Sequence, residues 1–152
     1  MLRHRSLTPR RHDHSLVHWP LTWPGGDPLG AAIHSSGPLA VVVMDGELDI
    51  ATAPGLGERL EPLADDGRHI LLDLTDLRFC DCAGLNMFLR LHNQATAAGG
   101  SLRLAAPTGP VSRLITTAEL SDVLLVTASV AEAIAALGEA ANSEPLLPAP
   151  KA

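Results

Sequence analysis

Aromatic residues are scarce in this sequence: Phe, Trp and Tyr make up 3% of its 152 residues, and tyrosine is absent. A hydrophobic core must therefore consist mainly of Leu, Val, Ile and Ala, and the 46% of hydrophobic residues suffices to build one. No apolar run approaches the roughly 20 residues that a membrane-spanning helix needs, so we expect no membrane insertion. The N-terminal residues Met1-Leu-Arg-His-Arg are not followed by the apolar segment of an export signal. We therefore expect a cytoplasmic protein.

Cysteine is also rare, and the two cysteines, Cys80 and Cys82, lie two positions apart. That spacing is geometrically awkward for an ordinary structural disulfide. Two thiols without a nearby histidine cannot complete a zinc site either. We therefore expect reduced thiols, as is usual in the cytoplasm, and neither a metal nor a cofactor.

Basic residues are few in the central part of the chain. Residues 31–141 contain fourteen acidic and six basic residues, whereas residues 1–30 contain four arginines and two aspartates. An acidic domain argues against nucleic acid as the main partner. It suits a protein partner with a basic face.

The hydrophobic pattern is regular between residues 29 and 140 and predicts one domain of the α/β class. Two strands joined by a Ser-Ser-Gly-Pro turn are expected within residues 30–49, and a helix capped by Thr52 follows. The later expected strands cover residues 68–77, 101–107 and 123–127, and the later expected helices cover residues 83–100, 109–120 and 129–137. This alternation predicts a mixed, mostly parallel β-sheet of about five strands with about four helices.

Both ends of the chain lack such a pattern. Residues 1–28 are rich in Arg, His and Pro, and we expect a flexible N-terminal extension there. Its tryptophans, Trp19 and Trp23, either pack loosely on the domain or form a docking peptide. Residues 141–152 are rich in proline, and we expect a disordered C-terminal tail.

A polar cluster lies where a predicted strand ends and a helix begins. In an α/β sheet, functional residues gather at junctions of this kind. The free amides at the helix N-terminus carry the positive end of the helix dipole, and Asp81 can cap them. Ala83 and Gly84 are small enough to let another backbone approach, whereas Cys80 should lie in the core beneath the turn. On physical grounds alone, a simple capped turn is as good an interpretation as a binding surface.

Two motifs give the domain a resemblance to a known family. Gly-Glu-Leu-Asp at residues 46–49 is followed by Thr-Ala at 52–53, and Asp-Cys-Ala-Gly-Leu at residues 81–85 follows a strand that ends in Asp-Leu. In this order, over about residues 30–138, they resemble the STAS domain of the bacterial anti-sigma factor antagonists.

The resemblance implies a non-catalytic protein-binding module that regulates a sigma factor by partner switching. Such an antagonist binds an anti-sigma factor, a serine kinase related to histidine-kinase-like ATPases, until a serine after the aspartate is phosphorylated. The implied contact surface has a centre and an edge: the centre comprises Asp81, Cys82, Ala83 and Gly84, and the edge comprises Glu47 and Asp49. No further carboxylate pair, histidine or metal-ligand set accompanies Glu47 and Asp49, so we expect no enzyme activity.

Cys82 stands where this family carries its phosphorylated serine. A serine kinase finds no hydroxyl there, so we expect a partner-binding domain that phosphorylation at this position does not switch off. One alternative is a thiol redox sensor, in which oxidation of Cys82 replaces phosphorylation. Another is an inert Cys82 with regulation at Thr75 or Thr52. A STAS subunit of a lipid-trafficking ABC transporter is a further alternative. The sequence gives no indication of the oligomeric state.

Overall fold

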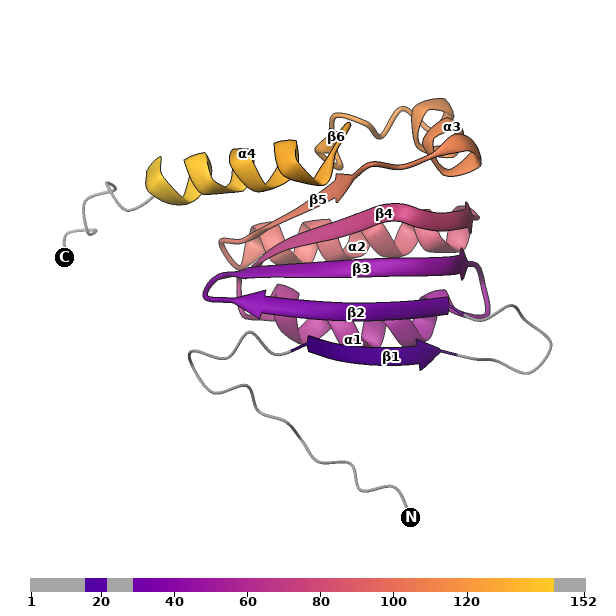
Figure 1. Ribbon diagram of the computed structural model, residues 1–152, viewed down its shortest axis with the longest axis horizontal. Helices are drawn as coiled ribbons and strands as arrows, with labels where there is room; N and C mark the ends of the chain where they lie inside the picture. Colours follow the sequence, from indigo (N-terminus) through magenta and orange to yellow (C-terminus); the bar gives the residue numbers. More distant parts are fainter. Residues whose placement is uncertain (1–15, 22–28, 144–152) are drawn as a thin grey trace, which may run out of the picture.

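The computed structural model describes residues 16–21 and 29–143, with side chains described for residues 29–138. This part of the chain contains a six-stranded sheet and four helices (Figure 1). The elements, in chain order, are β1 (Leu16–Leu21), β2 (Leu29–Ser36), β3 (Leu39–Leu48), α1 (Ala53–Asp65), β4 (His69–Cys80), α2 (Cys82–Ala97), β5 (Ser101–Ala105), α3 (Gly109–Thr117), β6 (Val126–Thr127) and α4 (Val130–Ser143).

The strands lie in the sheet in the order in which they follow one another along the chain. The pairs β1–β2 and β2–β3 are antiparallel, and the pairs β3–β4, β4–β5 and β5–β6 are parallel. Gly37 allows the tight connection between β2 and β3 because it adopts a φ of 57°, which most other residues avoid. The predicted mixed, mostly parallel sheet is confirmed.

Two strands differ from the sequence-based prediction. β1 was not predicted, because residues 16–21 contain a proline and lack a clear alternation. It pairs with β2 from Leu16 opposite His34 to Leu21 opposite Leu29. The strand predicted at residues 123–127 is reduced to β6, because the chain turns over residues 121–125. The predicted disordered tail at residues 141–152 begins too early, because α4 continues to Ser143. The rest of the predicted extension, including Trp23, and the last nine residues lie outside the described residues.

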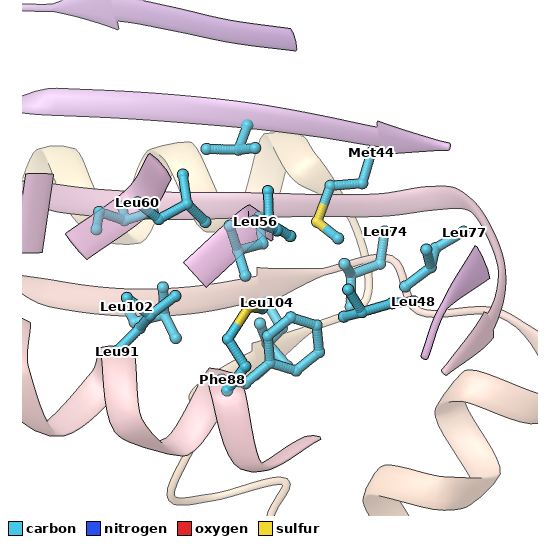
Figure 2. Close-up of a cluster of buried hydrophobic side chains, with 14 of the residues drawn as sticks. Met44, Leu48, Leu56, Leu60, Leu74, Leu77, Phe88, Leu91, Leu102 and Leu104 are labelled. Carbon is cyan, nitrogen blue, oxygen red and sulfur yellow. The ribbon is translucent and has the colours of Figure 1, made fainter. Parts of the chain in front are cut away.

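The core lies between the sheet and a pair of helices. α1 and α2 lie side by side on one face of the sheet (Figure 1). Leu56 of α1 and Phe88 of α2 point toward the buried residues of the strands, such as Met44 and Leu104 (Figure 2). Because this core contains mostly aliphatic side chains, it agrees with the scarcity of aromatic residues in the sequence.

α4 covers part of the opposite face of the sheet. Ala133 and Leu137 pack there against Leu71 and Ala105. With helices on both faces, β4 buries the consecutive apolar residues 70–72 completely. Ile134, on the same helix, is 43% exposed. In the described part of the chain, no helix is long and apolar enough to span a bilayer.

The parallel pairing of β3 and β4 positions the candidate site. Leu48 and Cys80, the last residues of these strands, are register partners. α1 and α2 begin just beyond this edge of the sheet (Figure 1). The turn at residues 49–52 therefore lies beside the start of α2, although about 30 positions separate them in the sequence.

Candidate functional site

Asp81 holds the first turn of α2 in place. Its backbone is extended, with φ −105° and ψ −172°, so the helix begins only at Cys82. Asp81 Oδ1 accepts hydrogen bonds from the N–H groups of Ala83 at 2.9 Å and Gly84 at 3.2 Å. These are amides that a helix N-terminus leaves without an internal partner, and the predicted cap is confirmed.

Asp81 also links the two neighbouring turns. Its second carboxylate oxygen, Oδ2, accepts a hydrogen bond from the N–H of Ile50 at 3.2 Å. Its own N–H donates to the carbonyl of Leu48 at 3.1 Å. The end of β3, the turn after it and the tip of α2 are thus held together through one residue, a connection that the sequence did not predict.

Asp49 shapes the turn between β3 and α1. Its Oδ1 accepts hydrogen bonds from the N–H groups of Ala51 at 2.9 Å and Thr52 at 3.0 Å. The Asp49 N–H donates to the hydroxyl oxygen of Thr52 at 2.9 Å, and that hydroxyl lies 3.0 Å from the carbonyl of Glu47. Glu47, near the end of β3, and Asp49, in the turn that follows, therefore lie close to each other beside Asp81. The half-buried Asp49 is first of all a turn-forming residue.

Thr52 does not fit the alternative of a phosphorylation site. It is fully buried, so a kinase cannot reach its hydroxyl in the folded protein. Thr52 occupies the N-cap position of α1 but makes no side-chain capping bond, unlike the prediction, because its hydroxyl serves the preceding turn instead. Thr75 is exposed, and its hydroxyl donates to Asp73 Oδ1 at 2.6 Å.

The two cysteines differ sharply in their surroundings. Cys82, the first residue of α2, is exposed, whereas Cys80 is buried at the end of β4, as predicted. The Cys80 thiol donates to the carbonyl of Asp81 at 3.4 Å. Burial, and to a smaller extent the neighbouring Asp81 and Cys82, raises the pKa of the Cys80 thiol to about 12. Cys80 therefore stays protonated at neutral pH, and Cys82 is the accessible thiol of this pair.

Gly84 is placed differently from the other predicted contact residues. It is buried, and a Cβ at this position would lie 2.7 Å from the sulfur of Cys80 and 2.8 Å from the side chain of Leu48. Such contacts are too short, so glycine is required for α2 to approach the ends of β3 and β4. Its small size serves packing within the domain rather than the expected approach of another protein's backbone.

Two exposed apolar residues beside this site were missed by the sequence analysis. Ile50 is 77% exposed and Phe79 is 42% exposed. Phe79 is the register partner of Glu47 near the ends of β3 and β4. Ile50 is a large apolar residue between the turn-forming Asp49 and the helix-starting Thr52, where no apolar pattern requires it, and that is the signal that could have identified it.

The remaining chemistry of the site is simple. Among the described residues, no group of three or more His, Cys, Asp or Glu side chains could hold a metal ion. The side chains gathered at the edge of the sheet are carboxylates, one thiol, small residues and exposed apolar residues. Such an arrangement is suited to contact with another protein, with Cys82 as the position that chemical modification can reach.

Comparisons with known proteins agree with this geometry. The profile of the STAS domain family matches residues 31–133. Over 83 residues, the chain is 34% identical to the anti-sigma-B factor antagonist of Bacillus subtilis (strain 168), which corresponds to 55% of this chain and 76% of the relative.

Solved structures share the fold. An anti-sigma factor antagonist from Mycobacterium paratuberculosis gives a TM-score of 0.65 at 21% identity, covering 76% of this chain and 97% of that protein. The anti-sigma factor antagonist SpoIIAA in its unphosphorylated form gives a TM-score of 0.63 at 19% identity, covering 72% and 96%. The comparisons favour an antagonist over the alternative of a transporter subunit. The chain belongs to the STAS domain family and, within it, to the anti-sigma factor antagonists.

Proposed function

We propose that this chain is a non-catalytic antagonist that binds an anti-sigma factor in the cytoplasm and thereby frees a sigma factor for transcription. The partner is an anti-sigma factor of the serine-kinase type, related to histidine-kinase-like ATPases. The contact is centred on Asp81, Cys82 and Ala83, together with the adjoining residues 47–50 at the end of β3 and the start of the next turn; we call this region the α2-tip surface. Gly84 supports it from beneath.

The exposed position of Cys82 on the first turn of α2 carries this proposal. Asp81 accepts two hydrogen bonds from that turn and a third from the N–H of Ile50 in the neighbouring turn, so the surface is formed before a partner arrives. A preformed surface binds with a smaller loss of conformational entropy than a flexible one. The small side chains of Cys82 and Ala83 leave room for close approach.

Phosphate at position 82 would oppose such a contact. A phosphoryl group adds about −1.5 to −2 charges next to the carboxylate of Asp81. The N–H groups of Ala83 and Gly84, which could have bound the phosphate, already donate to Asp81. The added charge would therefore face repulsion and desolvation within an interface. Because Cys82 has no hydroxyl, we infer that this antagonist keeps binding when a serine-bearing antagonist would be released.

A binding assay with purified anti-sigma kinases from the same genome tests this function. The natural protein and the Cys82→Ser variant are each mixed with the kinase, with and without ATP and Mg²⁺, and binding and phosphate incorporation are measured. We expect both proteins to bind without ATP. With ATP, only the Cys82→Ser variant should take up phosphate at position 82 and lose at least about tenfold in affinity, since about 1.4 kcal/mol suffices for that factor.

Two results would contradict the proposal. If none of the anti-sigma kinases binds the natural protein, the proposed partner is wrong. If the natural protein takes up phosphate and then dissociates from the kinase, a residue other than Cys82 is the switch. The Thr75→Val variant then serves as the control, because Thr75 is the exposed alternative named above.

The exposure of Cys82 also supports a second candidate function, that of a thiol redox sensor. Peroxide would oxidise the Cys82 thiolate to a sulfenic acid. The hydroxide that leaves the peroxide would take up a proton and become water. Cys80 is poorly suited to resolve this product, because its pKa of about 12 keeps it protonated. Peptide mass spectrometry after mild peroxide treatment tests the sensor. An unmodified Cys82, or an oxidised Cys82 that leaves partner affinity unchanged, would contradict it.

A further inference from the structure

A small groove continues the α2-tip surface along the two helices. It has a volume of about 160 Å³ and lies between the start of α1 and the exposed side of α2. Ile50, Ala53 and Pro54 line one wall, and Ala83 and Met87 line the other. Ile50 and Ala83 therefore belong both to this groove and to the α2-tip surface.

Arg90 gives one end of the groove a positive charge. Its guanidinium reaches over α1, where Arg90 Nη2 lies 3.0 Å from the position that a Cβ on Gly57 would take. Arg90 Nε is 3.9 Å from Glu61 Oε1, and both side chains are exposed, at 57% and 39%. A pair this long and this exposed contributes little energy, so Arg90 can interact with another carboxylate without a large loss.

We propose that the groove receives one apolar side chain of the anti-sigma factor, with a carboxylate of that partner next to it on Arg90. The groove is too small for a typical small-molecule ligand, which occupies about 300–1,000 Å³, but its size suits a single side chain. Ile50 is 77% exposed beside it and would become buried in the complex. The inference rests on the proposed function, because it assigns this groove to the same partner.

The charge of the domain supports a carboxylate of the partner as the group that contacts Arg90. Residues 31–141 contain fourteen acidic and six basic residues, so a partner that approaches this domain should be largely basic. An acidic residue on such a partner would be repelled over most of the surface and attracted at Arg90. This pairing would fix the register of the complex, because a shifted arrangement would place the carboxylate against acidic neighbours.

Affinity measurements with a purified anti-sigma kinase test the groove. The variants are Ile50→Ser, which removes the apolar anchor, and Arg90→Glu, which reverses the charge. Ile134→Ser and Arg113→Glu are matched controls, because both positions are exposed and lie on α4 and α3, away from the groove. We expect each groove variant to weaken the Kd at least about tenfold, and each control to change it less than about twofold.

A charge exchange sharpens the test. Each exposed Asp or Glu of the partner is replaced in turn by Lys, and one of these replacements should restore most of the affinity lost by Arg90→Glu. Circular dichroism and thermal unfolding confirm that the variants are folded, which is expected because Ile50 and Arg90 are exposed.

The outcomes separate this inference from the proposed function. If the natural chain binds the kinase and both groove variants bind within twofold of it, the groove inference is wrong and the proposed function stands. If no anti-sigma kinase binds the natural chain, the proposed function and the groove inference are both wrong. If sedimentation shows that the chain alone dimerises and that Ile50→Ser abolishes the dimer, a second copy occupies the groove and the proposal is overturned.

Discussion

The N–H of Ile50 donates a hydrogen bond to Asp81 Oδ2 at 3.2 Å, across 31 positions of the sequence. Because Asp81 Oδ1 caps α2 at the same time, one carboxylate fixes the helix tip and the neighbouring turn relative to each other. The proposed contact surface therefore includes residues of both segments. A change at Asp81 should alter folding stability as well as partner binding.

Replacing Asp81 tests this link. Asp81→Ala removes the acceptors for three N–H groups and should lower the free energy of unfolding by about 0.5–2 kcal/mol, the usual cost of losing an N-cap. Asp81→Asn should lose less stability than Asp81→Ala, because asparagine caps helices nearly as well as aspartate, but it cannot keep the bond from the N–H of Ile50, since its side-chain nitrogen is not an acceptor. Urea denaturation measures both variants, with Glu58→Ala on α1 as an exposed control. An Asp81→Ala variant as stable as the control would contradict the capping role.

Gly84 should be the least replaceable residue of the motif. The Cβ of an alanine there would lie 2.7 Å from the Cys80 sulfur and 2.8 Å from Leu48, so α2 would have to move outward. Overpacking of this kind costs about 1–3 kcal/mol. Gly138→Ala is the matched control, since a Cβ at that helical position has no neighbour within 4 Å. That control should stabilise the protein by up to about 1 kcal/mol, because alanine favours helices.

Equal effects of the two glycine substitutions in urea denaturation would show that close packing does not explain Gly84. We expect Gly84→Ala to lower the free energy of unfolding and Gly138→Ala to raise it. The comparison also separates a general preference of helices for alanine from the specific contact with Cys80 and Leu48.

The order of strands and helices could be predicted because its signals are local. The buried apolar run at residues 70–72 is typical of a strand that is covered on both faces. Ser129 is a typical residue at the start of a helix, and it accepts a hydrogen bond from the N–H of Glu132 at 3.1 Å. β1 escaped prediction because its pairing with β2 is a tertiary interaction and its own pattern is weak.

The same distinction applies to the site. The motif around residues 81–85 predicted the helix cap and the accessible cysteine. The bond from Ile50 to Asp81 and the groove beside it depend on how two distant segments meet, which no local pattern encodes. The role of Gly84 was misjudged for that reason: its nearest neighbours, Cys80 and Leu48, lie on β4 and β3 rather than on another protein.

Thiol labelling should distinguish the two cysteines. In the native protein at neutral pH, a maleimide should modify Cys82 and leave Cys80 unmodified, because Cys82 is exposed and Cys80 is buried. Intact-mass analysis should show one adduct before denaturation and two afterwards, and peptide mapping identifies the sites. The Cys82→Ser variant should show no native adduct. Rapid native labelling of Cys80 would contradict its place in the core.

Cys80 should also make the stability of the domain depend on alkaline pH. Folding raises the pKa of its thiol from 9.0 to about 12, so between these values the folded protein binds more protons than the unfolded chain. A rise in pH through this range therefore favours unfolding, by at most about 1.4 kcal/mol per pH unit, whereas below pH 9 the thiol is protonated in both states. Urea denaturation at several pH values measures the slope, and Cys80→Ala should flatten it even though its cavity lowers stability at every pH. Identical slopes for the two proteins would show that the Cys80 thiol ionises as easily in the fold as in the unfolded chain.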